Sequence, residues 1–357
     1  MPPTNPAKEI SDFHPFLQLA STGKPLKRNE MTKAMGLLLE GTVSDIEAAG
    51  FLMALRARGE SIEEITAAAS AMRAKALKIE LPSEVTEKLI DTAGTGGDGA
   101  GTYNISTAAA LIAAGAGAKV AKHGNRAATS LSGSSDVLSA LGVNLEATPE
   151  TIASCITTAN VGFMFAAYHH KATANVAAIR KSLGVRTIFN MLGPLTNPAG
   201  ARRQLMGVYD PSLCRPIANA LKTLGAKKAW VVHGRDGLDE LTTTTSTFVC
   251  ALEEGEISEF EIHPKDVGLK ISGTKSLQGG TSQDNATALR AILTEKVLNN
   301  QHNAYRDIAV FNAAAALIVA DLANTLKEGV DLAHTAIEDG SAANALEQLV
   351  EISNTAR

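Results

Sequence analysis

The residues best suited to chemistry begin with a glycine-rich loop at residues 94–99, which reads GTGGDG. It follows a short apolar run that starts at Leu89, expected to be a strand, and precedes an apolar helix expected over 106–115. Glycines let a phosphate approach the backbone, and free N–H groups and hydroxyls at a helix N-terminus form an anion site. A simple capped turn needs fewer glycines, so the loop predicts phosphate binding.

A second polar loop, residues 122–134, reads KHGNRAATSLSGS and follows a strand expected over 119–122. Its cations Lys122 and Arg126 and its four hydroxyls concentrate anion-binding groups in a chain of negative net charge. A solvated loop is the alternative interpretation. The loop lies one helix after the first, however, and loops at the ends of neighbouring parallel strands form a shared cleft.

Two adjacent carboxylates, Asp239 and Glu240, lie in HGRDGLDEL just after a strand expected over 229–232. Alone, such a pair is usually surface charge. Beside phosphate loops it indicates magnesium, which takes few protein oxygens and shares the rest with water and phosphate. Residues 94–99 also match the dinucleotide pattern GxGxxG, but that fold needs an acid at the end of the second strand, where this chain has Lys122 and His123.

Two other features allow either a functional or a purely structural interpretation. His169 and His170 could ligate a metal, but no third ligand has matching spacing, so a satisfied polar pair at a helix start is favoured. Arg180 lies among apolar residues. It could extend past them to solvent, or it could bind a substrate carboxylate through both of its terminal nitrogens.

The elements that must position these residues follow from patterning and caps. Ser44 with Glu47, and Ser61 with Glu64, form capping boxes before helices expected over 45–58 and up to about residue 76. Further helices are expected over 29–40, 149–160, 168–183 and 211–224, with two or three more from residue 285; further strands are expected over 161–165, 248–252 and 257–262.

This pattern predicts an α/β protein with a small all-helical N-terminal domain and a larger α/β domain. The larger domain has a mainly parallel central sheet flanked by helices. We expect the helical domain to span residues 1–84, joined by helices from about 168–200, and the α/β domain to span 85–357. Two domains also suit a chain of 357 residues.

Composition excludes several classes of function. The net charge is −4 and the sequence pI is about 6.1, so the chain has no overall positive charge that would attract nucleic acid or an anionic membrane. The apolar runs are too short to span a bilayer, and the first residues lack the apolar core of a signal peptide. Three widely spaced cysteines predict buried thiols in a reducing cytoplasm.

Together the motifs GTGGD, KHGNR and LDE, with VRTIFNMLGPLTNP and QLMGVYDPSL, resemble the anthranilate phosphoribosyltransferase family of tryptophan biosynthesis. The resemblance covers nearly the whole chain. It implies the fold of the nucleoside phosphorylase-like phosphoribosyltransferases, a homodimer formed through the helical domain, and an active site between the two domains. It further implies transfer of the phosphoribosyl group of phosphoribosyl pyrophosphate (PRPP) to the amine of anthranilate.

The resemblance also assigns residues. Two Mg²⁺ ions per subunit would be held by Ser106, Asp239 and Glu240, and anthranilate would meet Gly94, His123, Asn125, Arg180 and Pro194. PRPP would lie on a larger set: Gly94, Gly97, Asp98, Thr102, Asn104, Ile105, Ser106, Thr107, Lys122, His123, Gly124, Asn125, Arg126, Ala127, Ala128, Thr129, Ser130 and Ser134. Lys122, Asp239 and Glu240 would act electrostatically, with no acid or base catalyst.

The chain departs from the family at Gly101, Tyr103 and Leu131, and around the His pair, where residues 167–173 lack the usual prolines and methionine. This last departure concerns the outer part of the anthranilate channel. Two rival functions are a pyrimidine nucleoside phosphorylase, which needs no magnesium, and a non-catalytic relative that binds nucleic acid. The GTGGD loop with Asp239 and Glu240 argues against the first, and the negative net charge argues against the second.

Overall fold

The computed structural model describes residues 11–127 and 131–355, and these form two compact units. The first unit comprises the described residues up to Lys75 together with His170–Leu192. The second comprises Ala76–His169 and the described residues from Gly193 onward. The domain limits expected from the sequence, near residues 84, 168 and 200, stay a prediction.

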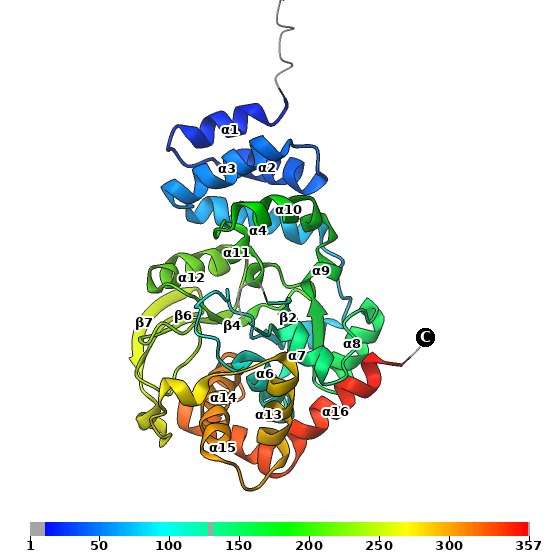
Figure 1. The fold of residues 1–357 in the computed structure, drawn as a ribbon, viewed down its shortest axis with the longest axis vertical. Helices are drawn as coiled ribbons and strands as arrows, with labels where there is room; N and C mark the ends of the chain where they lie inside the picture. Colours follow the sequence, from blue (N-terminus) through cyan, green and yellow to red (C-terminus); the bar gives the residue numbers. More distant parts are fainter. Residues whose placement is uncertain (1–10, 128–130, 356–357) are drawn as a thin grey trace, which may run out of the picture. The chain divides into compact units, whose positions relative to one another are not determined.

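The first unit is built only of helical segments in its described part. They are α1 (His14–Ser21), α2 (Arg28–Glu40), α3 (Asp45–Arg58), α4 (Ile62–Lys75), the 3-10 turn η1 (Lys171–Thr173), α10 (Ala174–Leu183) and α11 (Phe189–Leu192). Figure 1 shows the green α10 beside the blue α2 and α3, although α10 comes much later in the chain. The Asn175 side chain on α10 donates to the Leu39 carbonyl of α2 at 2.9 Å.

The predicted caps explain where α3 and α4 begin. Of the two pairs, Ser61 and Glu64 form the full capping box, because Glu64 also accepts from the Ser61 N–H at 2.9 Å, whereas Glu47 accepts from the Ser44 hydroxyl. The Ser44 hydroxyl accepts from the Glu47 N–H at 3.4 Å, and the Ser61 hydroxyl accepts from the Glu64 N–H at 3.2 Å. Glu64 is fully buried and does more than cap α4, because its carboxylate accepts two hydrogen bonds of 2.7 Å from Arg58 and one of 2.9 Å from the Leu26 N–H. One side chain therefore joins the loop before α2, the end of α3 and the start of α4.

The second unit is organised around one sheet. Its strands are β1 (Leu89–Asp91), β2 (Lys119–Gly124), β3 (Val161–Phe165), β4 (Arg203–Gly207), β5 (Lys228–Gly234), β6 (Thr247–Glu253) and β7 (Glu256–Ile262). Their order is β3-β2-β1-β4-β5-β6-β7, parallel as far as β5 and antiparallel for the last two pairs. The mainly parallel sheet is thus confirmed. The strand order reverses between β1 and β4, where parallel sheets bind ligands at the carboxyl ends of their strands.

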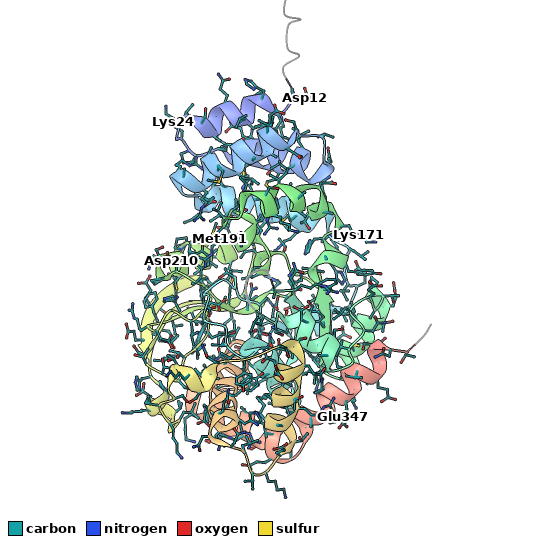
Figure 2. The ribbon with its side chains drawn as sticks, in the orientation of Figure 1. Asp12, Lys24, Lys171, Met191, Asp210 and Glu347 are labelled. Atoms are coloured by element: carbon teal, nitrogen blue, oxygen red, sulfur yellow. The ribbon has the colours of Figure 1, made fainter. Side chains whose placement is uncertain are left out.

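Helices flank this sheet. In chain order they are α5 (Ser83–Thr86), α6 (Ile105–Gly115), α7 (Ser134–Ala140), α8 (Pro149–Thr158), α9 (Ala166–His169), η2 (Pro194–Thr196), η3 (Pro211–Leu213), α12 (Cys214–Thr223), η4 (Pro264–Val267), η5 (Thr274–Leu277), α13 (Ser282–Thr294), α14 (Asn300–Val319), α15 (Leu326–Glu338) and α16 (Ser341–Ser353). Helices α6 and α14 pack against each other, and most of their residues are buried. On the outer α16, Glu347 points to solvent while Leu346 and Leu349 are buried (Figure 2).

Several expectations about elements were wrong. The helix expected over 168–183 is broken, because the His169 carbonyl and ring pair with the main chain of Leu77, at 2.9 and 2.7 Å, and His170 leaves helical geometry. Strand β4 was not predicted, and four helices rather than two or three follow residue 281. The early helix α1 was also missed. None of the helices in the described ranges is long and apolar enough to cross a membrane.

Candidate active site

The first predicted loop leaves the sheet at the end of β1. Three of its glycines, Gly96, Gly97 and Gly99, have φ between 63° and 83°, a conformation that side chains disfavour. The loop is anchored on the neighbouring strand β4, because the Thr95 N–H donates to the Gly207 carbonyl at 2.9 Å. The sequence therefore needs glycine here for backbone geometry.

Asp91, the last residue of β1, joins the two predicted loops. Its buried carboxylate accepts from the His123 N–H on β2 and from the Ala93 N–H, both at 3.1 Å, and from the Asn197 side chain at 2.7 Å. The carboxylate thus provides an acceptor to β2 where the main chain of β1 turns away. Burial raises the pKa of Asp91 to about 6, against the opposing effects of Asn197 and the nearby Lys122.

The predicted carboxylates lie in the segment between β5 and β6, against the first loop. The Gly96 N–H donates to Asp239 Oδ2 at 2.7 Å, and Asp98 hydrogen-bonds to the same carboxyl. Burial, followed by the charge of Asp98, raises the pKa of Asp239 to about 7. Burial and the charge of Asp239 raise the pKa of Glu240 well above its ordinary value, although Lys122 and the Ser106 N–H oppose this shift. Burial and mutual repulsion therefore both disfavour the charged forms of these two carboxylates.

Lys122 lies nearly fully buried at the end of β2, 2% exposed. Its Nζ donates to the Thr92 and Ser106 hydroxyls, both at 3.3 Å. Burial lowers the pKa of Lys122, while Asp91 and Glu240 act in the opposite direction. Lys122 is therefore a buried cation that lies between Thr92, the start of α6 at Ser106, and Glu240 of the carboxylate segment.

The start of α6 completes this arrangement. Asn104 precedes the helix, and Ile105, Ser106 and Thr107 form its first turn. The Ile105 N–H donates to the Tyr103 carbonyl at 2.8 Å, the Thr107 N–H donates to the Asn104 carbonyl at 3.2 Å, and the Ser106 N–H donates to Glu240. Thr102 pairs in an isolated bridge with Gln278. Of the predicted PRPP residues, Ser106 thus lies beside both Lys122 and Glu240, and Asp98 lies close enough to Glu240 to affect its pKa, all inside one unit.

The second predicted loop is closed by an acid that the sequence did not single out. Asp136 on α7 accepts from the Gly133 N–H at 2.9 Å and from the Ala127 N–H at 3.0 Å. The Ser134 hydroxyl donates to the Asn125 carbonyl at 3.4 Å, next to the exposed Arg126. Gly124 ends β2. The predictions for Ala128, Thr129 and Ser130 lie outside the described residues.

The residues assigned to anthranilate are divided between the units. His123 Nδ1 lies 3.0 Å from the Gly193 carbonyl, and the Pro194 carbonyl accepts from the Gln204 side chain at 2.5 Å, both within the second unit. Arg180 belongs to the first unit, on α10. Its guanidinium lies 5.2 Å from the centre of the Phe189 ring, and burial lowers its pKa. Arg180 is therefore packed on an aromatic ring and is not a freely extended surface side chain.

The carboxylate segment fits magnesium. Its oxygen donors are the ligands that this ion prefers, and a bound cation would offset the burial and mutual repulsion that raise the pKa values of Asp239 and Glu240. Among the residues that the structure describes, no three His, Cys, Asp or Glu side chains are grouped as a metal site. An ion bound by these two carboxylates would complete its coordination with water, a hydroxyl or a ligand phosphate.

Comparison with known proteins agrees with this geometry. Residues 14–76 match the family model described as "Glycosyl transferase family, helical bundle domain", and residues 86–343 match the model described as "Glycosyl transferase family, a/b domain". The chain is 51% identical over 345 residues to an anthranilate phosphoribosyltransferase of Chelativorans sp. (strain BNC1), covering 97% of this chain and 99% of the relative. The chain belongs to the anthranilate phosphoribosyltransferase family.

Solved structures of other anthranilate phosphoribosyltransferases match the whole fold. The enzyme of Thermus thermophilus has a TM-score of 0.88 and 41% identity, covering 95% of this chain and 99% of that one. The Saccharomyces cerevisiae enzyme in complex with PRPP and Mg has a TM-score of 0.87 and 27% identity, covering 97% and 99%. The same yeast enzyme in complex with 4-fluoroanthranilate has a TM-score of 0.85 and 26% identity, again covering 97% and 99%.

Several residues that organise the site were not predicted as site residues. Asp91 and Asn197 lie within the motifs DTAGTGGD and LTNP, and Asp136 lies three residues after Gly133, but nothing in the sequence joined them to the loops. A carboxylate that ends an apolar strand is the one signal that could have identified Asp91, since such a group needs partners. The histidine pair is buried, with His169 at the end of α9 and His170 directly before η1. The expectation that both histidines are satisfied fails at His169, because its Nε2 is buried without a hydrogen-bond partner in the described part of the chain.

Proposed function

We propose that this enzyme transfers the 5-phosphoribosyl group from PRPP to the amino group of anthranilate. The products are N-(5′-phosphoribosyl)anthranilate and pyrophosphate. The observation that carries the proposal is the convergence of the glycine loop, the buried Lys122 and the Asp239–Glu240 segment within one unit. The relatives at about 50% identity, which carry this name over their whole length, support the same reaction.

In this proposal the amine attacks C1 of the ribose as the bond to pyrophosphate breaks, with inversion at that carbon. Lys122 and the positive N-terminal end of α6 stabilise the negative charge that gathers on the leaving pyrophosphate. An aromatic amine is nucleophilic when neutral, so the reaction needs no strong general base. The site is therefore mainly electrostatic, and orientation of the two substrates supplies the rest of the rate enhancement.

Two magnesium ions per subunit belong to the proposal, held by Ser106, Asp239 and Glu240. Bound magnesium supplies positive charge to the pyrophosphate group. The PRPP residues are those assigned above in the two loops and the first turn of α6. Arg180 binds the anthranilate carboxylate, and Gly94, His123, Asn125 and Pro194 contact the rest of that substrate.

A homodimer and a cytoplasmic location complete the proposal. Three apolar side chains on α1 and α3 support the dimer, because Leu19, Ile46 and Met53 are 39%, 86% and 36% exposed in the single chain. Light scattering should give twice the mass of one chain, and a monomer at micromolar concentration would refute the assembly. The three cysteines are buried and unpaired, as a reducing compartment allows.

The decisive experiment follows the fluorescence of anthranilate with purified protein. The signal should fall only when PRPP and Mg²⁺ are both present, and it should persist with the Asp239→Asn/Glu240→Gln protein. Asp331→Asn, an exposed carboxylate of α15, is the matched control and should behave as the wild type. Persistent fluorescence with the wild type, together with phosphorolysis of thymidine or uridine, would favour the nucleoside phosphorylase alternative.

A further inference from the structure

The inference concerns α14, a buried helix of the second unit that none of the motifs includes. Its buried residues are mostly alanine, valine and isoleucine, yet Tyr305 and Asn312 are also fully buried in it. A buried amide or phenol is costly unless it is hydrogen-bonded, so both side chains should have specific partners. In each case the partner belongs to a segment of the proposed site.

Asn312 holds the main chain of Leu241, the residue that directly follows Glu240. The Leu241 N–H donates to Asn312 Oδ1 at 3.0 Å, and Asn312 Nδ2 donates to the Leu241 carbonyl at 2.8 Å. Asn312 Nδ2 also donates to the Ile308 carbonyl of its own helix at 2.9 Å. The Asn312 amide therefore makes the two main-chain hydrogen bonds that a neighbouring strand would otherwise make to Leu241. It fixes the carboxylate segment on α14.

Tyr305 holds the other side of the site. Its hydroxyl donates to the Asn104 carbonyl at 3.2 Å, immediately before the turn of α6 that carries Ser106 and Thr107. Its ring stacks on Tyr103 with 4.3 Å between centroids and an interplanar angle of 11°. Burial raises the pKa of Tyr305 well above its ordinary value, so the phenol keeps its donor proton.

Tyr305 and Asn312 are seven residues apart, which is nearly two helical turns, so they lie on one face of α14 about 10 Å apart along the axis. We propose that Tyr305 and Asn312 are positioning residues that use α14 to set the separation between the carboxylate segment and the first turn of α6. This inference rests on the proposed function, because these are the two segments assigned to magnesium and pyrophosphate. Neither side chain reaches solvent, so each acts through the segment it holds.

The test compares Tyr305→Phe, Asn312→Leu and the double variant with the wild type. Tyr305→Phe removes one hydroxyl and keeps the ring stack, and Asn312→Leu keeps the volume but leaves both main-chain groups of Leu241 unpaired. The matched control is Ser353→Ala, which removes a buried hydroxyl on α16 that accepts from the Asn144 N–H at 3.1 Å. Thermal melts with increasing Mg²⁺ and inorganic pyrophosphate give a binding readout independent of turnover, and steady-state kinetics give KM and kcat.

Both positioning variants should need about tenfold more Mg²⁺-pyrophosphate for half of the stabilising shift in Tm, and their KM for PRPP should rise similarly, while KM for anthranilate changes less than twofold. Ser353→Ala should lower Tm without changing these concentrations. Variants that lose Tm but bind Mg²⁺-pyrophosphate as the wild type does would overturn the positioning role. If the proposed function is wrong, the wild type itself will neither consume anthranilate nor be stabilised by Mg²⁺-pyrophosphate, and both proposals then fall.

Discussion

Gly207 at the end of β4 provides a sharp test of how the carboxylate segment is positioned. A Cβ added there would lie 1.5 Å from the Asp239 carbonyl oxygen and 2.4 Å from the carbonyl carbon. Even the tight contact distance of 3.0 Å would require this backbone oxygen to move by roughly 1.5 Å. The Gly207→Ala substitution therefore displaces the main chain of a proposed magnesium-binding residue and not merely a flexible side chain.

The expected size of the effect follows from that displacement. A misplacement of about 1 Å can cost around 10²-fold in rate, so kcat/KM for PRPP should fall at least about 10²-fold in Gly207→Ala. At Gly94 the added Cβ would meet Asp239 Oδ2 and the Gly207 carbonyl, both at 3.1 Å, which a small shift relieves. Gly94→Ala should therefore have a smaller defect. Gly36→Ala in α2, where the Cβ meets nothing within 4 Å, should have none.

Anthranilate consumption at several PRPP and Mg²⁺ concentrations ranks the three variants, and circular dichroism with a thermal melt shows whether each is folded. The reasoning is refuted if folded Gly207→Ala keeps the wild-type dependence on PRPP and Mg²⁺.

Three further outcomes are expected. The folded protein holds the Asp91 proton up to about pH 6, whereas the unfolded chain releases it near pH 3.8. As pH rises through that window, Asp91 therefore lowers the free energy of unfolding by on the order of 3 kcal/mol. Urea titrations from pH 4 to 7 should show that Asp91→Asn lacks this decline, and the same change in the free energy of unfolding with pH in both proteins would contradict it. Arg180→Ala should mainly raise KM for anthranilate, and an unchanged KM would remove Arg180 from the site. Burial raises the pKa of the thiols of Cys155, Cys214 and Cys250 to about 11, 12 and 11. None of the three should therefore react with a thiol reagent at pH 8 until the protein is unfolded. Fast labelling of the native protein would contradict their burial.

Local signals predicted much of the fold. The cap at Ser44 and Glu47 correctly located the start of α3, and Gly41 ends α2 in the left-handed conformation expected of a C-cap. Strand β4 was missed because its five residues, RQLMG, carry neither a clear alternation nor a long apolar run. The helix expected over 168–183 is broken by pairing with Leu77, a contact with a residue far back in the chain that a local pattern cannot show.

The same distinction applies to the site. The two loops and the carboxylates were predictable because their residue types and spacing belong to the chemistry of phosphate and magnesium. The residues that hold them were not, since they lie in apolar stretches and their partners are distant in sequence. The Asp91 carboxylate meets an N–H 32 residues away, Asn312 pairs with a residue 71 away, and the Tyr305 hydroxyl meets a carbonyl 201 away.

The first unit is discontinuous in sequence, and this affects how it can form during synthesis. Helices α1 to α4 leave the ribosome first, but α10, which packs on α2 and α3, is made only after β1, β2 and β3. At about 5–20 residues per second, the roughly hundred residues between α4 and the end of α10 take on the order of 5–20 s to synthesise. During that interval the growing chain carries an uncovered apolar surface on α2 and α3, so a nascent chain arrested before residue 174 should be a better substrate for chaperones than the finished protein.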